Sequence, residues 1–206
     1  MVNKKLTTQQ NNSLFEDFLE DYNQYCGIDE AGRGPIAGPL VVAGVILLKP
    51  IEGLADSKKL SEKRREILYK EIQKSAKFFI YQVDADKIDE IGLSRAIKES
   101  LLAIKERLQN MKYLFDGNST FGVDGIETMV KADTKVDSVS AASILAKVTR
   151  DRLMVAYAKT YPNYGFENHK GYGTKAHLEA IAKYGYTPIH RKSFKIKLPN
   201  KEKSLI

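Results

Sequence analysis

Two adjacent carboxylates open the stretch of sequence that could carry chemistry, GIDEAGRGPIAGP. Asp29 and Glu30 are followed closely by the segment Gly32-Arg33-Gly34. Carboxylate oxygens bind divalent cations, and an arginine beside backbone N–H groups can hold a phosphodiester. The combination therefore predicts a metal site next to a bound phosphate.

Two phosphate-binding motifs are similar to this stretch, and neither fits. The phosphate loop G-x-x-x-x-G-K-[ST] is excluded because Arg33 and Gly34 replace its lysine and hydroxyl residue, and the acidic pair would repel a phosphate. The dinucleotide pattern G-x-G-x-x-[GA] must open a helix, whereas Pro35 and Pro39 lead into an apolar run rich in Val and Ile. A glycine turn between hairpin strands, with a solvated acidic pair, stays open as an alternative.

Two further aspartates follow predicted strands. The strand at 113–115 ends in Asp116, and the strand at 126–130 ends in a segment that contains Asp133. An Asp-Gly pair such as the one at Asp116 also commonly marks a turn, but acidic residues are depleted in strands. A mixed sheet with helices on its faces would bring these strand ends together with the first acidic pair.

Four carboxylates in one place need a cation, because they would otherwise stay protonated or move apart. Oxygen ligands without cysteine or histidine select Mg²⁺ or Mn²⁺. Two such ions, about 3.5–4 Å apart, can activate a water and stabilise the leaving oxygen of an in-line phosphoryl displacement. We therefore expect two ions when substrate is bound.

Hydroxyl, basic and aromatic side chains in three further segments could contact a nucleic-acid backbone or stack on it. They lie in a basic loop, along one side of a long helix that also carries Arg150, and in a glycine-rich loop. A solvated loop and an ordinary packed helix stay open as alternatives. The candidates are Ser57, Lys58, Ser140, Ser143, Lys147, Lys170 and Tyr172.

Hydrophobic periodicity predicts an α/β domain with a mixed sheet. We expect a flexible N-terminal segment (1–20), a catalytic core (21–160), and a C-terminal helical extension with a basic tail (161–206). The predicted strands are 25–28, 40–48, 78–83, 113–115 and 126–130. The predicted helices are 14–22, 62–74 after the N-cap Ser61, 93–108, 137–161 with Asp137 or Ser138 as N-cap, and 175–184.

The composition of the 206 residues restricts the class of protein. Lys and Arg number 33 against 26 Asp and Glu, so the net charge of +7 favours a polyanionic partner. Cys26 is the only cysteine, which excludes a disulfide within the chain, and we interpret it as a small buried apolar residue. Residues 1–13 lack the apolar core of a signal peptide, and no segment is long enough to span a bilayer. We expect a cytoplasmic protein that does not bind membranes.

The three histidines, His169, His177 and His190, lack the spacing of a zinc site, and we interpret them as non-ligands. The tail from His190 is strongly basic. Its default interpretation is a solvated tail, and a phosphate contact is the second.

The motifs together are similar to those of ribonuclease HII. They are GIDEAGRGPIAGP, DSKKL, the FDGN after a strand, KAD before SAASILAKVTRD, and KGYGT with PIHRKSF, in this order from Cys26 to Phe194. The resemblance implies a ribonuclease H-like fold: a five-stranded mixed sheet flanked by helices, with a helical C-terminal extension. The intact Gly32-Arg33-Gly34 points away from the related ribonuclease HIII.

The resemblance also implies the roles of individual residues. It implies that Asp29, Glu30, Asp116 and Asp133 bind the metal ions, with Asp29 shared between both. Gly32-Arg33-Gly34 is similar to the family's ribose-contacting turn. Tyr172 is similar to the tyrosine that stacks on the deoxyribose after an RNA-to-DNA junction.

We therefore expect a metal-dependent endoribonuclease that cleaves RNA in RNA–DNA hybrids and at single ribonucleotides in duplex DNA, leaving 3′-hydroxyl and 5′-phosphate ends. We expect it to act as a monomer, and a replication or repair protein to dock on the tail. A non-catalytic nucleic-acid-binding protein and a DNA nuclease or integrase-like relative on the same fold are the alternatives.

Overall fold

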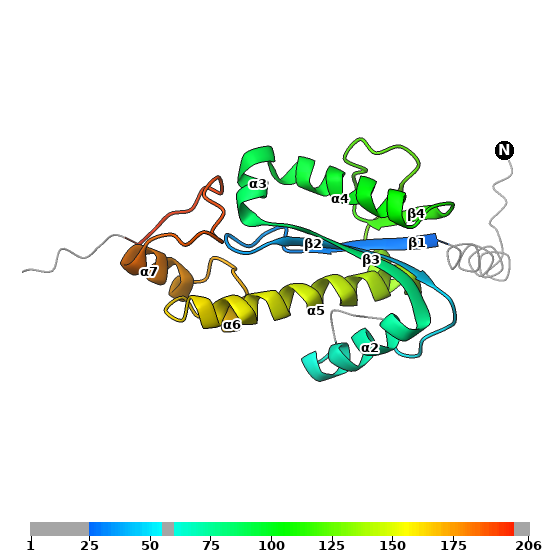
Figure 1. Ribbon diagram of the computed structural model, residues 1–206, viewed down its shortest axis with the longest axis horizontal. Helices are drawn as coiled ribbons and strands as arrows, with labels where there is room; N and C mark the ends of the chain where they lie inside the picture. The colour runs from blue at the N-terminus through cyan, green and yellow to red at the C-terminus, as the bar shows by residue number, and fades with distance from the viewer. Residues whose placement is uncertain (1–24, 55–59, 200–206) are drawn as a thin grey trace, which may run out of the picture.

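Five strands form one mixed sheet in the order β3-β2-β1-β4-β5 (Figure 1). In this computed structural model the described residues are 25–54 and 60–199. The strand pairs β1–β2 and β2–β3 are antiparallel, whereas β1–β4 and β4–β5 are parallel. The strands are β1 (Tyr25–Ala31), β2 (Leu40–Leu47), β3 (Ala76–Val83), β4 (Lys112–Asp116) and β5 (Glu127–Met129). The predicted five-stranded mixed sheet is confirmed.

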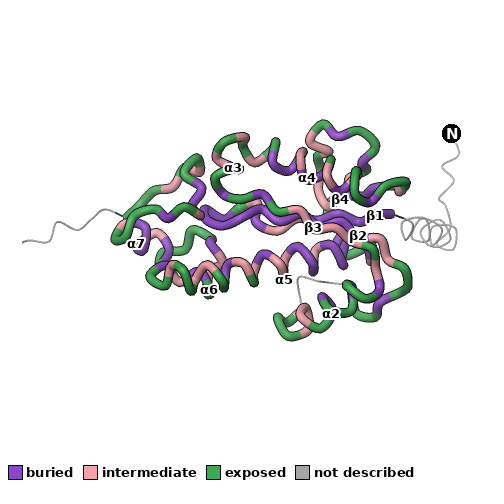
Figure 2. The backbone as a smooth tube through the Cα atoms, in the orientation of Figure 1, coloured by how far each residue is buried: buried purple, intermediate pink, exposed green. Residues whose placement is uncertain are grey.

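Helices cover both faces of the sheet. The long α5 runs along one face with α2 beside it, and α3 and α4 cover the other face (Figure 1). The inner strands β1 and β2 are almost continuously buried between these layers (Figure 2), whereas β3 is mostly half-buried. The helices are α2 (Glu62–Ser75), α3 (Ala85–Ile91), α4 (Leu93–Arg107), the 3₁₀ helix η2 (Ala132–Thr134), α5 (Asp137–Thr160), α6 (Phe166–His169) and α7 (Lys175–Tyr184).

The inner strand β2 is apolar on both faces because helices cover both faces of the sheet. Its residues alternate between the two cores: Leu40 and Val42 pack in the α4 core, whereas Val41 and Ala43 pack in the α5 core. Successive side chains of a strand point to opposite faces, so a run of Val and Leu suits a strand buried twice. Cys26 is fully buried as predicted, and burial raises the pKa of its thiol to about 12.

Two of the predicted helices form as expected, with one error in the buried side. The hydroxyl oxygen of Ser61 accepts the N–H of Arg64 at 3.2 Å and caps α2. The sequence pattern places Ile67, Leu68 and Ile72 on the apolar side of this helix. Leu68 and Ile72 are buried, but Ile67 is 48% exposed, so its placement was wrong. Along α4 the predicted apolar side is buried. No helix among the described residues is long and apolar enough to cross a membrane.

Other boundaries differ from the predictions. The helix α3 was not predicted, because Asp84 and Asp86 resemble a turn after β3, whereas Asp84 is the N-cap of this helix. The N-cap of α5 is Val136, so neither Asp137 nor Ser138 has the predicted role. The predicted helix at 14–22 lies outside the described residues. The division of the chain at 160 stays a prediction.

The start of the basic tail is buried rather than solvated, so that prediction was wrong. His190 and Arg191 are each 1% exposed. His190 forms an isolated β-bridge with Ala37, and the N–H of Arg191 donates to the carbonyl of Ile36 at 2.8 Å. The carboxylate of Asp89 on α3 accepts the backbone N–H groups of residues 192 and 193. These bonds tie the C-terminal segment to the loop that follows β1.

His190 and His177 link Thr187 to Tyr172 through a chain of hydrogen bonds, in which each group donates to the next. The N–H of Thr187 donates to Nδ1 of His190 at 2.8 Å. Nε2 of His190 therefore carries its proton and donates to Nε2 of His177 at 3.1 Å. Nδ1 of His177 then donates to the carbonyl of Tyr172 at 2.9 Å. Both rings are neutral, because a second proton on either would place two N–H groups against each other.

We predict that acidification destabilises the fold through these two rings. Burial lowers the pKa of His177 and of His190 to about 4, from an ordinary 6.5. The unfolded chain therefore binds protons first as the pH falls, and the free energy of unfolding should fall by about 1 kcal/mol per histidine between pH 7 and pH 5.5. Urea denaturation at the two pH values measures this. His190→Gln should reduce the difference, and equal stability of the natural chain at both values would contradict the assignment.

Candidate active site

Strand pairing places two of the predicted acids side by side. In the parallel pair of β1 with β4, Ile28 lies opposite Phe115. Asp29 follows Ile28 on β1, and Asp116 follows Phe115 on β4. Both carboxylates therefore lie at the same end of the sheet. Parallel strands present their carboxyl ends at one edge, which is why residues so distant in sequence meet here.

The third acid arrives from a helix rather than a strand. Asp133 lies in η2 after a chain reversal at Lys131, whose φ of 59° is left-handed. The prediction of a strand-terminal Asp133 was therefore wrong, because β5 ends at Met129. Oδ1 of Asp116 accepts the N–H of Ala132 at 3.1 Å and fixes this reversal. Carboxylate oxygens of Asp29, Asp116 and Asp133 lie within 4.8 Å of one another.

These three residues, which we call the acidic triad, suit a divalent cation. Asp29 is 6% exposed and Asp133 is fully buried. Burial raises the pKa of Asp29 well above its ordinary value, and the charges of Glu30 and Asp116 raise it further. The hydroxyl of Ser143 and the N–H of Glu30 donate to Asp29 and oppose this rise. An oxygen-only set of crowded, buried carboxylates fits Mg²⁺ or Mn²⁺, whose charge would relieve the repulsion.

Glu30 lies beside the triad and is bonded to arginine. It follows Asp29 on β1, so the two side chains leave the strand toward opposite faces. Oε1 of Glu30 is 2.8 Å from Nη2 of Arg33. The guanidinium of Arg33 in turn lies over the ring of Phe121, 5.6 Å from its centroid. A metal-binding role for Glu30 therefore stays a prediction.

A cavity of about 560 Å³ is lined by Asp29 and Asp116 of the triad, though not by the buried Asp133, together with most of the predicted substrate contacts. The ring of Tyr172 lies beside Gly34, with Cε1 3.7 Å from the point where a Cβ of Gly34 would stand. The turn after β1 and the tyrosine therefore face one space. The predicted residues that line the cavity are Asp29, Glu30, Gly32, Arg33, Gly34, Asp116, Ser143, Lys147 and Tyr172.

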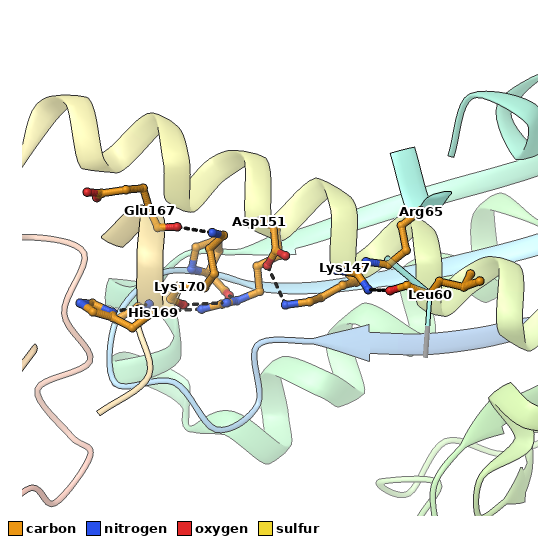
Figure 3. A network of polar contacts seen from close by, with 11 residues as sticks. Leu60, Arg65, Lys147, Asp151, Glu167, His169 and Lys170 are labelled. Atoms are coloured by element: carbon orange, nitrogen blue, oxygen red, sulfur yellow. Dashed lines mark hydrogen bonds and ion pairs between the residues drawn. The ribbon is translucent and has the colours of Figure 1, made fainter. Parts of the chain in front are cut away.

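Some predicted contacts lie elsewhere. Ser140 is 1% exposed and its hydroxyl donates to the carbonyl of Leu54, so its prediction as a substrate contact was wrong. Lys170 is not part of the cavity lining, and its ammonium donates to the carbonyl of Glu167 (Figure 3). Ser57 and Lys58 lie outside the described residues.

Three basic residues of the cavity wall were not predicted as substrate contacts. Arg65 comes from α2, where its guanidinium donates to the carbonyl of Leu60 (Figure 3). Lys131 comes from the reversal before η2. Arg150 belongs to α5 and was noted only as part of a basic helix side. Nothing in the local sequence distinguishes these cations from the other basic residues of the chain. Lys147 pairs with Asp151 at 2.8 Å on the same helix.

A family model described as Ribonuclease HII matches residues 26–197. The chain belongs to the ribonuclease HII family. A ribonuclease HII of Sulfurovum sp. (strain NBC37-1) is 62% identical over 172 residues, which cover 84% of this chain and 92% of the relative. The predicted family is thereby confirmed.

Solved structures of ribonucleases H have the same fold. A chain in the PCNA:RNase HII complex from Archaeoglobus fulgidus superposes with a TM-score of 0.73 at 30% identity, covering 86% of this chain and 98% of that chain. Bst-RNase HIII, solved with Mn²⁺, gives a TM-score of 0.67 over 94% of this chain and 73% of that one. At 16% identity the second likeness shows the fold alone.

Membership in the ribonuclease HII family makes the chain a hydrolase, a metal-dependent endoribonuclease of the RNase H type. The predicted ribonuclease H-like fold and the predicted enzyme class are confirmed. No finding supports a non-catalytic nucleic-acid-binding protein or a DNA nuclease.

We predict that Asp29→Asn stabilises the metal-free protein. The substitution removes a buried negative charge that two neighbouring carboxylates oppose, and each kcal/mol relieved corresponds to roughly 2–4 °C in Tm for a chain of this size. Thermal melting in EDTA measures the gain, with the exposed Glu106→Gln as a control for loss of an acidic group. A lower Tm for Asp29→Asn than for the natural chain in EDTA would contradict carboxylate crowding.

Proposed function

We propose that the protein cleaves the RNA strand of RNA–DNA hybrids and single ribonucleotides embedded in duplex DNA. One observation carries this proposal: Asp29 and Asp116 of the acidic triad, the turn of Gly32-Arg33-Gly34 and the ring of Tyr172 line one cavity, and the buried Asp133 lies directly behind the two aspartates. Metal-assisted hydrolysis alone needs only the acids. The turn and the ring supply surfaces that can distinguish a ribose from a deoxyribose.

The acidic triad, with Glu30 next to it, would hold the metal, and we propose two Mg²⁺ or Mn²⁺ ions with substrate bound. Such cations supply Lewis-acid activation of water and of the phosphate oxygens. The residues fit this role because the donor set is made of carboxylates only.

Recognition of the ribose falls to the backbone of the turn. The 2′-hydroxyl is both donor and acceptor and is the group that separates RNA from DNA. Gly34 is exposed at the cavity, so no side chain of its own stands between its peptide groups and a bound sugar, whereas Gly32 is buried against Arg150. Tyr172, 48% exposed, offers an aromatic face for stacking on the next sugar. Lys147 offers a positive charge for the phosphate backbone.

The bond that breaks joins phosphorus to the 3′ oxygen of the ribonucleotide. Water adds its oxygen to phosphorus, and the products carry a 3′-hydroxyl and a 5′-phosphate. The chain's own contribution is to orient the phosphate between the triad and the turn. Such positioning with fixed charges accounts for most of the catalysis in phosphoryl transfer.

We also propose that the protein acts as a monomer, and that a replication or repair protein docks on the tail. The relative in the complex with PCNA supports a partner of the sliding-clamp class. Residues 200–206 of the tail lie outside the described residues. A cytoplasmic location stays a prediction.

One cleavage assay tests the proposed function. A DNA duplex with a single ribonucleotide should be cut with Mg²⁺ or Mn²⁺ and left intact with EDTA, while an all-DNA duplex should stay intact. If neither duplex is cut under any condition, the remaining interpretation is a non-catalytic nucleic-acid-binding protein. Equal cutting of both duplexes would favour a DNA nuclease.

We predict that Asp116→Asn keeps substrate binding and lowers turnover by at least ~10²-fold, as the loss of comparable charge-stabilising groups does. The amide keeps the side chain's size and its acceptor for the N–H of Ala132 but loses the charge. Single-turnover cleavage and the binding of the ribonucleotide duplex in EDTA measure the two effects. Near-normal turnover would remove Asp116 from the metal site.

We predict that Tyr172→Ala weakens the preference for a ribonucleotide followed by DNA by about 1–3 kcal/mol, the range for one stacking contact. The ratio of cleavage rates at such a junction and inside a long RNA–DNA hybrid measures this. Tyr186→Ala is the matched control, since Tyr186 is similarly exposed (45%) and is not part of the cavity wall. An unchanged ratio in Tyr172→Ala would return this residue to a purely structural role.

A further inference from the structure

The loop after β1 is held from behind by a buried guanidinium. We call residues 32–39 the glycine turn. Arg150 of α5 is 1% exposed, and its Nε donates to the carbonyl of Pro39 at 2.9 Å while its Nη2 donates to the carbonyl of Ala37 at 3.0 Å. Its Nη1 donates to the carbonyl of Lys170 at 2.9 Å. Lys170 belongs to the segment 169–174, which we call the tyrosine loop because it carries Tyr172.

A second buried guanidinium holds the same turn. Arg191, also 1% exposed, donates from Nε to the carbonyl of Gly38 at 2.9 Å and from Nη1 to the carbonyl of Arg33 at 3.4 Å. Its backbone N–H donates to Ile36. The two arginines together engage five carbonyl groups, four of them in the glycine turn and one in the tyrosine loop.

Burying the two guanidinium groups destabilises the fold through the loss of their hydration. Burial lowers the pKa of Arg150. Burial and the charge of Arg150 lower the pKa of Arg191 to about 9. Each buried cation loses several kcal/mol of hydration, which carbonyl bonds offset only if the geometry is good. Apolar side chains would fill the same space without placing two positive charges near each other, so stability alone does not account for the pair.

The glycine turn and the tyrosine loop are closely packed against each other. A Cβ on Gly32 would stand 2.3 Å from Nε of Arg150, and one on Gly171 would stand 2.3 Å from the carbonyl oxygen of Ala37. Both glycines also have positive φ, 103° and 85°. The N–H groups of Ile36 and Ala37 donate to the carbonyl of Gly171. The glycine turn and the tyrosine loop therefore touch through their backbones, with Arg150 bonded to both.

We propose that Arg150 and Arg191 are positioning residues that set the distance between the ribose-contacting backbone and Tyr172. The proposal rests on the proposed function, because it concerns how that function distinguishes a ribonucleotide from DNA. Arg150 matters most, since its planar fork joins a carbonyl two residues before Tyr172 to carbonyls of the glycine turn. An ammonium group is a point charge and cannot span these acceptors with the same geometry.

The test measures substrate discrimination without cleavage. In an Asp116→Asn background, the Kd for an all-DNA duplex divided by the Kd for the same duplex with one ribonucleotide gives the discrimination ratio. Arg150→Lys keeps the positive charge and should lower this ratio at least tenfold. Arg191→Lys should lower it in the same direction. In the otherwise natural chain, Mn²⁺ binding measured by calorimetry should change less than twofold, because the triad lies on other elements.

Arg152→Lys is the matched control. Arg152 lies two residues further along α5, and its guanidinium pairs with Glu66 and lies over the ring of Tyr69, away from both loops. The same substitution there should leave the discrimination ratio unchanged. A general weakening of α5 would instead affect Arg150→Lys and Arg152→Lys alike, since both residues lie on this helix.

The outcomes separate this inference from the proposed function. If the Asp116→Asn chain with both arginines intact binds both duplexes equally, the proposed function fails and the positioning role fails with it. If that chain discriminates and Arg150→Lys discriminates equally well, only the positioning role is overturned. Loss of Mn²⁺ binding together with discrimination, or a variant that does not fold while Arg152→Lys folds, also overturns it, because the arginine then supports the whole fold.

Discussion

Repulsion among buried carboxylates is the constraint on which the rest of this structure depends. The parallel register of β1 and β4 places Asp29 beside Asp116, and the chain reversal after β5 adds Asp133 to the same point. Left alone, such a cluster favours protonation or separation. The strand pairing and the bond from Ala132 to Asp116 hold the three side chains together, so a bound divalent cation would relieve the repulsion, as we propose.

The proposed substrate-contacting surface is built differently from the acidic triad. The proposed metal site is made of side chains at the end of the sheet, whereas the proposed substrate-contacting surface next to it is made of backbone in two loops. Loops are usually the adaptable parts of a protein, yet here they are fixed by carbonyl bonds to Arg150 and Arg191 and by the histidine chain that ends at Tyr172. Rigid backbone suits the recognition of a single hydroxyl group, since small displacements would remove the contact.

The sequence predicted the sheet, the main helices and the acids, because these leave local signals. The β2 run and the α4 periodicity reflect burial directly, and Asp116 follows an obvious strand. The true position of Asp133 depends on the left-handed Lys131, and its neighbourhood resembles a strand end. Arg150 looked like a surface cation because its acceptors, such as Pro39, are backbone groups distant in sequence. The burial of His190 was hidden for the same reason.

The bonds between the C-terminal segment and the glycine turn affect the order in which the protein can fold during translation. All three acids of the triad precede residue 134, but the turn gains its bond to Arg191 only from a residue 158 positions further along than Arg33. Contacts between such distant residues form late, because the intervening chain must be ordered first. During translation the part of the sheet that carries the triad can therefore assemble before the glycine turn has all its bonds. If the proposed roles hold, a nascent or shortened chain would carry the acids without a complete surface for choosing a substrate.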